Sequence, residues 1–357
     1  MTNKRVERLR SKLAELGLEA FLIGSGHNRR YISGFTGSSG MVLLTEKGTF
    51  LLTDFRYTVQ AEQQAPGFTI VEHAVNPLET VRDLLSESGA KRLAFEQEHT
   101  VYGNFVRYGR TLGDVELVPS AGIVEGLRVI KEQSEIAIMQ EAAELADATF
   151  AHIIGLIAAG VKESDIALKM EMFMRSRGAT SSSFDTIVAS GERSALPHGV
   201  ASERIIGTDE FVKLDFGAYY HGYCSDLTRT VVVGKPSERH RDIYNIVLEA
   251  QMNALQNIRP GMTGKEADAL ARDVIARYGY GEQFGHSTGH GLGMEIHEEP
   301  RLSMRSDTVL VPGMTVTVEP GIYIPGFGGV RIEDDILITD TGIRILTSSP
   351  KELLVLQ

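Results

Sequence analysis

The sequence contains a single cysteine, Cys224, and no tryptophan among its 357 residues. One cysteine cannot form an internal disulfide, and such sparing use is typical of proteins in the reducing cytoplasm. No apolar run approaches the roughly 18 residues needed to cross a bilayer. The N-terminal segment MTNKRVERLRSKLAEL also lacks the apolar core of a secretory signal. We therefore expect a cytoplasmic protein without a membrane span, in which Cys224 is a small buried residue rather than a nucleophile.

Basic residues are also in deficit, with 36 Lys and Arg against 47 Asp and Glu, which gives a net charge of -11. A nucleic-acid-binding protein would show a basic face, so this balance argues against that class. The surplus of carboxylates is compatible with metal binding. The length and the 42% of hydrophobic residues are typical of a globular protein of about two domains.

The first third of the chain alternates between short apolar runs and amphipathic segments. Val6, Leu9, Leu13 and Leu16 have helical spacing, with Thr2 as a possible N-cap. A second helix is expected near residues 77–88. Strands are expected in AFLIG, MVLLT, TFLLTD, FTIVEH, RLAFE and VELVP. This pattern predicts an N-terminal α/β domain over residues 1–123.

The remaining residues, 124–357, begin with a strongly helical stretch from about residue 125 to residue 158 and contain a weak internal repeat. Segment 159–178 resembles segment 260–279 in layout, because each has glycine at its second position and again 18 residues later. One interpretation is a duplicated domain with a site between its halves. The alternative is two unrelated amphipathic helices that both end in glycine caps.

Three of the ten histidines lie in the twelve residues HSTGHGLGMEIH, namely His286, His290 and His297. The three intervening glycines, Gly289, Gly291 and Gly293, argue against a helix, where each would cost about 1 kcal/mol. We therefore expect an irregular or extended segment whose backbone and side chains gather around something small.

Two pairs of carboxylates lie at spacings that place them opposite each other in β-hairpins. If the hairpin in 211–233 is centred between Tyr220 and His221, Asp215 faces Asp226 across the strands. The alternative is a different register that leaves both aspartates solvated. Facing carboxylates repel unless one holds a proton or a cation lies between them.

The second pair is Glu319 and Glu333, which are equidistant from Gly326 in the glycine-rich turn of VTVEPGIYIPGFGGVRIEDDILIT. Arg331 shares the strand face of Glu333, since side chains alternate along a strand. By the same rule Thr228 shares the face of Asp226 and is a candidate hydrogen-bond partner near the site. An ordinary strand threonine is the alternative for Thr228.

Four carboxylates and one imidazole form an oxygen-rich set of ligands that balances the charge of two divalent cations. Oxygen ligands favour Mn²⁺ or Mg²⁺, and a histidine favours Mn²⁺, Co²⁺ or Zn²⁺. Because five side chains are too few for two separate sites, some carboxylates must bridge the ions. Paired metals of this kind typically support hydrolysis.

These residues and their contexts LDFG, SDLTRT, GHSTGHGLG, VEPGIY and GVRIEDD resemble the prolidase/aminopeptidase P family. YISGFTGSSG and DFRYTVQA resemble the N-terminal domain of the family, so the resemblance covers nearly the whole chain. It implies an α+β pita-bread fold, two duplicated halves around a curved antiparallel sheet, behind a smaller α/β domain. It also implies a homodimer that hydrolyses the Xaa-Pro bond of peptides with two divalent metal ions per subunit, Mn²⁺ being expected and Co²⁺ or Zn²⁺ possible.

The resemblance also assigns roles to individual residues. It makes Glu319 the general base as well as a ligand, and Arg331 a partner that orients a ligand carboxylate. It makes His198, His286 and His297 auxiliary histidines that contact the substrate and the tetrahedral intermediate. The implied metal ligands are Asp215, Asp226, His290, Glu319 and Glu333.

Arg301 and Gly291 bear on the branch of the family. Arg301 occupies the position of the arginine that clamps the substrate carboxylate in short prolidases, and a solvated surface arginine is the alternative. Gly291 stands where many aminopeptidases P carry tryptophan. Both residues favour an Xaa-Pro dipeptidase, with an Xaa-Pro aminopeptidase as the alternative. Methionine aminopeptidases usually lack the first domain, and creatine-hydrolysing or purely binding relatives lose the metal ligands.

Overall fold

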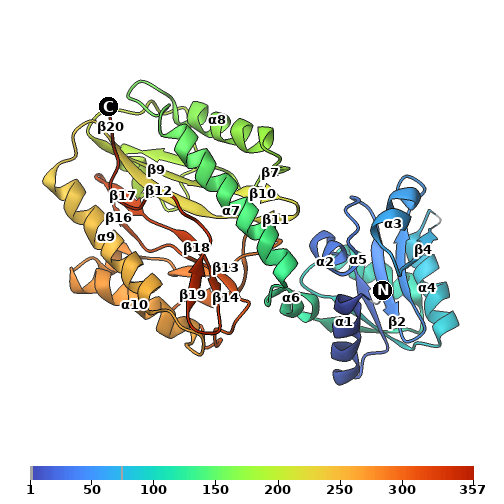
Figure 1. The fold of residues 1–357 in the computed structure, drawn as a ribbon. Helices are drawn as coiled ribbons and strands as arrows, with labels where there is room; N and C mark the ends of the chain where they lie inside the picture. Colours follow the sequence, from blue (N-terminus) through green and yellow to red (C-terminus); the bar gives the residue numbers. More distant parts are fainter. Residues whose placement is uncertain (1–2, 74) are drawn as a thin grey trace. The chain divides into compact units, whose positions relative to one another are not determined.

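The computed structural model describes residues 3–73 and 75–357 and divides into two compact units, Met1–Arg128 and Val129–Gln357 (Figure 1). This division lies a few residues beyond the boundary at residue 123 expected from the sequence. Each unit has its own sheets and its own hydrophobic core.

Unit 1 is a six-stranded sheet with helices, in the strand order β4-β3-β2-β1-β5-β6. The pairs β1/β2 and β2/β3 are antiparallel, whereas β3/β4, β1/β5 and β5/β6 are parallel. The strands are β1 Ala20–Ile23, β2 Met41–Thr45, β3 Thr49–Thr53, β4 Thr69–Glu72, β5 Arg92–Glu96 and β6 Glu116–Ser120. The helices are α1 Lys4–Glu15, α2 Gly26–Ser33, α3 Thr58–Gln64, α4 Pro77–Ser88, α5 Tyr102–Leu112 and α6 Ile123–Arg128.

All six predicted strands and the predicted helix at 77–88 are confirmed, because in each case the apolar run is short and bounded by turn residues. The first helix differs in its ends. Asn3 is its N-cap and accepts hydrogen bonds from the N–H groups of Arg5 and Val6, and Thr2 lies outside the described residues. Leu16 follows the last helical residue and is half exposed.

The continuous helix predicted from about residue 125 to residue 158 is wrong, since the chain leaves the helix between Arg128 and Gln133. There the backbone N–H of Lys131 donates to the carbonyl of Gly313 at 2.8 Å, so a tertiary bond replaces a helical one. Glu132 then starts α7 (Gln133–Ile153) with a capping box to Glu135.

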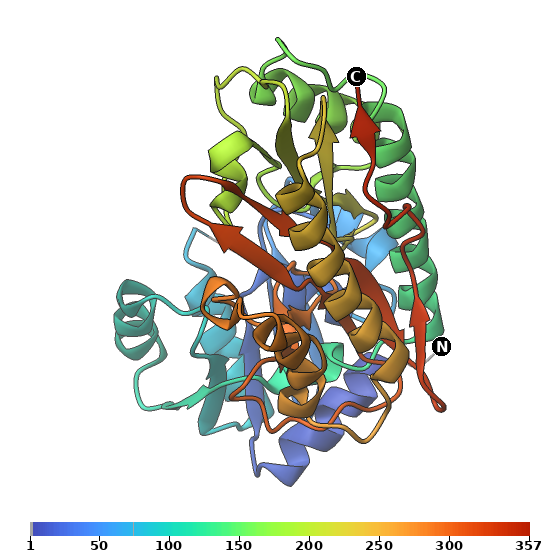
Figure 2. The same ribbon diagram turned by 90° about the vertical axis from the view of Figure 1, so that its left-hand side faces the viewer.

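Unit 2 places two pairs of long helices, α7 with α8 and α9 with α10, against short sheets (Figures 1 and 2). The remaining helices are α8 Glu163–Ser176, η1 Gly191–Ala195, α9 Glu238–Asn257, α10 Gly264–Arg277 and η2 Gly281–Gln283. The strands of the first half are β7 Ser181–Ser182, β8 Ile187–Ser190, β9 Glu210–Phe216, β10 Ala218–Tyr220, β11 Tyr223–Cys224 and β12 Leu227–Val233. Those of the second half are β13 Gly289–Gly291, β14 Glu298–Leu302, β15 Thr315–Val318, β16 Gly321–Ile324, β17 Gly328–Arg331, β18 Asp334–Ile338 and β19 Ile343–Ile345. The last strand, β20 Val355–Leu356, returns to the first half and pairs in parallel with β12.

The repeated segments are structurally equivalent. Gly160 and Gly261 have φ of 91° and 92°, and Gly178 and Gly279 have φ of 107° and 86°. Helices α8 and α10 both have 14 residues, and both end in a bond from the third residue after the helix to a carbonyl five residues back. In each half the helix leads to an antiparallel sheet, β8-β9-β12 or β13-β15-β18. The predicted α+β fold with a duplicated second domain is confirmed.

Among the residues that the structure describes, no helix has the length and apolar content needed to span a bilayer. Cys224 is buried, and burial raises the pKa of its thiol to about 12, as suits a structural residue.

Candidate metal centre

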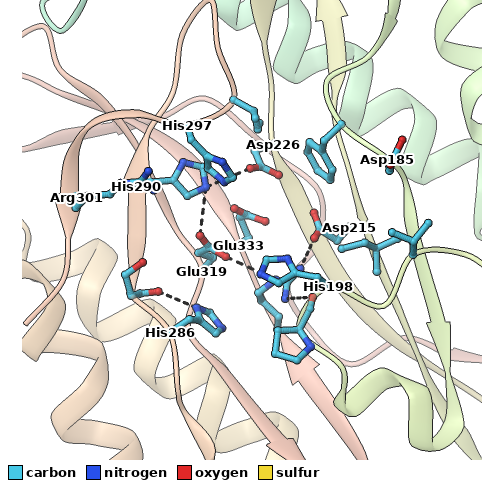
Figure 3. A pocket seen from close by; sticks show the side chains of 17 residues that line it. Asp185, His198, Asp215, Asp226, His286, His290, His297, Arg301, Glu319 and Glu333 are labelled. Atoms are coloured by element: carbon cyan, nitrogen blue, oxygen red, sulfur yellow. Dashed lines mark hydrogen bonds and ion pairs between the residues drawn. The ribbon is translucent and has the colours of Figure 1, made fainter. Parts of the chain in front are cut away.

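A cavity of about 450 Å³ lies in unit 2 and brings together residues from both repeats (Figure 3). Of the site residues expected from the sequence, only Thr228 does not line it. Those that do are His198, Asp215, Asp226, His286, His290, His297, Arg301, Glu319, Arg331 and Glu333. The wall is completed by Phe184, Asp185, Ile187, Pro197, Val200, Ser287 and Ile296.

The first hairpin has a different register from the predicted one. Asp215 pairs with Thr228, and the turn is centred between His221 and Gly222 instead of between Tyr220 and His221. The prediction that Asp215 faces Asp226 is therefore wrong. The reason is the turn type, because His221 and Gly222 have φ of 47° and 92°, as a type I′ turn requires. Asp226 nevertheless lines the cavity, since it lies in a short break between β11 and β12.

The second hairpin has the predicted register, with Gly326 at its centre. Gly321 pairs with Arg331 in β16/β17, and Val318 pairs with Asp334 in β15/β18. Glu319 and Glu333 therefore lie at opposite positions of the hairpin, just outside these ladders.

The segment HSTGHGLGMEIH is irregular except for the short strand β13, as predicted. A Cβ at Gly289 would lie 1.9 Å from the carbonyl oxygen of Thr317, and one at Gly291 would lie 2.2 Å from that of Glu299. Only glycine therefore lets β13 pass between its neighbours and present the His290 side chain between them.

His290 faces the carboxylates through its Nε2 atom. This atom lies 3.4 Å from Glu319 Oε1 and 3.6 Å from Asp226 Oδ2, and Nδ1 donates to the Gly291 carbonyl at 3.0 Å. Burial lowers the pKa of His290 to about 3, so the ring is neutral at pH 7. The Nδ1–H bond leaves the Nε2 lone pair directed at the carboxylates, as a metal ligand requires.

The carboxylates have the properties expected of metal ligands. Ligand atoms of Asp226, His290 and Glu333 all lie within 4.8 Å of one another. Thr228 donates to Glu333 Oε2 at 2.6 Å, whereas the buried Glu333 Oε1 has no hydrogen-bond partner in the described residues. Burial, followed by the neighbouring carboxylates, raises the pKa values of both Asp226 and Glu333 well above their usual range. A divalent cation would satisfy the unpaired oxygen and offset this repulsion, so the residues fit a metal.

Arg331 is buried and links three elements of the site. It pairs with Asp215, donates from Nε to Thr228 Oγ1 at 3.0 Å, and donates from Nη1 to the Tyr323 hydroxyl at 2.8 Å. Because Thr228 passes a hydrogen bond on to Glu333, the guanidinium orients two carboxylates at once.

The three auxiliary histidines differ in their surroundings. His286 is engaged at both nitrogens, since Nδ1 bonds the Ser287 carbonyl at 2.8 Å and Nε2 bonds the Tyr323 hydroxyl at 2.7 Å. His297 stacks edge-to-face on His290 with ring centroids 4.4 Å apart. His198 and His297 are both exposed, so their ring nitrogens can reach a ligand in the cavity.

Arg301 is the cross-strand partner of His290 in β13/β14. Its side chain lines the cavity, and among the described residues it makes no hydrogen bond or ion pair. A half-buried guanidinium without an internal partner is suited to an anionic ligand.

Several residues of the site were not predicted. Asp335 accepts the N–H of Asp226 at 2.9 Å, Lys213 donates to the carbonyl of Pro197, and Tyr323 accepts from Arg331. Asp335 and Lys213 are two residues from Glu333 and Asp215, so strand alternation could have placed them on the same faces. Asp185 lines the cavity from the loop before β8, and no motif pointed to it.

A duplicated α+β unit with four carboxylates and a neutral histidine around one cavity defines a metallohydrolase. The chain belongs to metallopeptidase family M24, whose model matches residues 137–340, and its first unit matches the Creatinase/Prolidase N-terminal domain over residues 5–130. The pita-bread fold expected from the sequence is thereby confirmed.

Full-length relatives include proteins from both branches of the family. The structure of an Xaa-Pro dipeptidase from Bacillus anthracis is 56% identical, with a TM-score of 0.97 and 99% of each chain covered. An Xaa-Pro dipeptidase from Pyrococcus horikoshii is 41% identical over 99% of both chains. The structure of an X-Pro aminopeptidase from Thermotoga maritima is 40% identical, with a TM-score of 0.91 and 97% and 99% of the two chains covered.

Proposed function

We propose that this metallopeptidase is an Xaa-Pro dipeptidase that uses two divalent metal ions per subunit. The dipeptidase names of two full-length relatives support this assignment. The observation in this chain that supports it most strongly is Arg301, which lines the cavity opposite His290 and whose guanidinium has no partner among the residues that the structure describes. In a dipeptide the residue after the scissile bond ends in a carboxylate, which a guanidinium can bind with two hydrogen bonds.

The five residues Asp215, Asp226, His290, Glu319 and Glu333 would hold the metals, with Mn²⁺ expected and Co²⁺ or Zn²⁺ as alternatives. Bound divalent cations supply Lewis acidity and lower the pKa of water. Arg331 and Thr228 keep the carboxylates in place, and the neutral His290 presents Nε2 to the centre.

Glu319 is proposed as the base that takes the proton from the attacking water. Burial raises the pKa of this carboxyl to about 7 in the metal-free protein, near the range in which a group can both accept and release a proton at neutral pH. His198 and His297 would donate hydrogen bonds to the oxygen on which negative charge develops. His286, which binds Tyr323, would contact the substrate with its ring face while supporting Arg331 through that tyrosine.

The alternative function is that of an Xaa-Pro aminopeptidase, which releases the first residue of longer peptides. The similarity to the Thermotoga maritima aminopeptidase supports this alternative. In that case the cavity would have to admit residues beyond proline, and Arg301 would not meet a terminal carboxylate.

Hydrolysis of matched dipeptides tests the proposal. The Mn²⁺-loaded protein should cleave an Xaa-Pro dipeptide much faster than the corresponding Xaa-Ala dipeptide. Chelation should abolish the activity, and added Mn²⁺ or Co²⁺ should restore it. Full activity in protein shown by elemental analysis to be metal-free would contradict the proposal.

We further propose that the protein works in the cytoplasm as a homodimer, on the basis of the family resemblance. Light scattering after gel filtration should give a mass of twice the 39.1 kDa of one chain. A monomeric mass at micromolar concentration would contradict the dimer.

A further inference from the structure

The exposed His198 belongs to a loop whose two ends and apex are held by hydrogen bonds to buried side chains. We define the His198 loop as residues 190–202, which leave β8, pass through η1 and return to the start of α8. His198 lies at the apex and lines the cavity near Asp215 and Glu319 (Figure 3). Exposed loops of this length are usually mobile, so a fixed imidazole needs specific restraints.

Glu163 closes the two ends of the loop. Its carboxylate is fully buried at the start of α8. Oε1 accepts the N–H and the hydroxyl of Ser190, both at 2.8 Å. Oε2 accepts the N–H of Ser202 at 3.1 Å and its hydroxyl at 2.6 Å. One side chain thus joins residues that are twelve positions apart.

Arg193 connects this closed end to the returning strand of the loop. Its guanidinium pairs with Glu163 and donates to the Val200 carbonyl at 2.7 Å. The pair compensates the charge of the buried carboxylate, which would otherwise be costly inside the protein.

Lys213 holds the apex. Its Nζ donates to the carbonyls of Leu196 and Pro197 at 2.6 Å and 3.3 Å, directly before His198. Arg331 adds a third bond to the Pro197 carbonyl at 3.0 Å. Lys213 is fully buried and, among the described residues, forms no ion pair. An apolar side chain would fill this place at lower desolvation cost, so the hydrogen bonds to the loop carbonyls are the feature that needs the amino group.

We propose that Glu163 and Lys213 are positioning residues that fix His198 over the metal centre. The inference rests on the proposed function in that His198 is taken to act on the substrate. Neither residue lines the cavity. Glu163 contacts the loop from below, and Lys213 binds its apex while its Nζ also lies 5.0 Å from the centroid of the Tyr323 ring. Their loss leaves the metal ligands in place and lets the imidazole move away from the position in which it meets the developing charge.

A double-mutant cycle measures this coupling. Glu163→Gln should lower kcat by about tenfold to a hundredfold with little change in KM, because small displacements of a catalytic group have effects of this size. His198→Ala should lower kcat by about 10²–10³. The double variant should be no slower than His198→Ala, since there is then no imidazole left to position. Lys213→Met should show the same pattern.

The matched control is Glu171→Gln, the same change on the exposed face of α8, where Glu171 pairs with Arg175 and with no other described residue. This variant should keep the wild-type kcat. Metal content should be unchanged in all variants. Losses that multiply in the double variant, or an unchanged kcat in His198→Ala, would overturn the inference.

A readout without substrate separates this inference from the proposed function. In protein with ¹⁵N-labelled histidine and bound Zn²⁺, the His198 imidazole signals are assigned by their absence in His198→Ala. They should shift or broaden in Glu163→Gln and stay in place in Glu171→Gln, even if the wild type cleaves no dipeptide. If Glu163→Gln does not fold, Ser202→Ala removes one hydroxyl from the same carboxylate and should produce the smaller version of both effects. Unmoved His198 signals in folded Glu163→Gln or Ser202→Ala protein would contradict the positioning role.

Discussion

At the scale of single residues, two histidines that are seven positions apart have different surroundings. His290 is buried, is neutral and has one nitrogen committed to a backbone carbonyl, whereas His297 is exposed and packs on it edge-to-face. These surroundings suit a ligand and a substrate-facing group, respectively.

We predict that His290→Ala loses bound metal, because the remaining ligands are all carboxylates that repel one another. His297→Ala should keep the wild-type metal content and lower kcat by about 10²–10³, the usual cost of losing a donor to a developing oxyanion. Elemental analysis and steady-state kinetics on both variants provide the test. Equal metal contents in the two variants would show that the assigned roles are wrong.

Arg301 carries the substrate prediction. Arg301→Ala should lower kcat/KM on Xaa-Pro dipeptides about tenfold to a hundredfold, since a charge-assisted hydrogen bond contributes about 1.5–3 kcal/mol. Arg301→Lys should recover only part of the lost kcat/KM, because an ammonium group cannot form the two parallel hydrogen bonds that a planar guanidinium makes to a carboxylate. The exposed Arg305, four residues later, is the control, and Arg305→Ala should have no effect. An equal loss on dipeptides and tripeptides would assign Arg301 a general structural role.

The sequence was sufficient to bring most of the lining residues together, because strand alternation and family motifs both act locally. It did not indicate Tyr323, whose hydroxyl joins His286 to Arg331. That role depends on which atoms of β16, β17 and the irregular segment before β13 meet. Asp185 was not indicated for a related reason, since it reaches the cavity from a loop without a periodic pattern.

At the scale of elements, each repeated helix supplies side chains that form hydrogen bonds to a segment containing a site histidine. In the first repeat α8 supplies Glu163. In the second repeat α10 supplies the ion pair of Asp268 with Arg272. Asp268 accepts the N–H of Thr288 at 2.9 Å, and Arg272 donates to the carbonyl of His286 at 2.7 Å. The two helices therefore position the site from opposite halves of the duplication with different residues.

Gly217 is the critical residue of the first hairpin. A Cβ there would lie 1.7 Å from the carbonyl oxygen of Ser225, which no side-chain adjustment can relieve. Gly217→Ala should therefore destabilise the protein by several kcal/mol and reduce metal binding by displacing Asp226. Gly285→Ala, where nothing lies within 4 Å, is the control and should have a wild-type melting temperature. Similar melting temperatures for both variants would contradict the close packing of this hairpin.

The two hairpins also show what limits prediction of register. The second was correctly centred on Gly326 because its turn is rich in glycine. The first was displaced by one residue because His221, a non-glycine residue, adopts positive φ beside Gly222. The break between α6 and α7 was missed for a different reason, namely that a long-range bond from Lys131 to Gly313 interrupts a locally helical sequence.

At the scale of the whole molecule, metal binding and proton release are linked. Burial raises the pKa values of Asp226 and Glu333 well above their usual range and that of Glu319 to about 7 in the metal-free protein. Groups whose pKa is raised on folding stabilise the protein below their unfolded pKa, and this contribution is lost as the pH rises through the folded value. Because bound metal replaces these protons, the metal-loaded protein does not lose this stabilisation as the pH rises.

We therefore predict that saturating Mn²⁺ raises the melting temperature by about 5–10 °C at pH 7, as expected for a ligand at about 100 times its Kd. The difference between metal-loaded and metal-free protein should increase from pH 6 to pH 8. Calorimetric titration in two buffers of different ionisation enthalpy should show proton release. A pH-independent difference, or binding without proton release, would contradict the protonated state of the empty cluster.

The central claim is that the metal cavity selects a dipeptide through Arg301. The most direct test is the ratio of kcat/KM for an Xaa-Pro dipeptide to that for the matched Xaa-Pro-Xaa tripeptide with the Mn²⁺-loaded protein. The account predicts a ratio well above one in the wild type that falls toward one in Arg301→Ala. A wild-type preference for the tripeptide would contradict it and assign the protein to the aminopeptidase branch of the family.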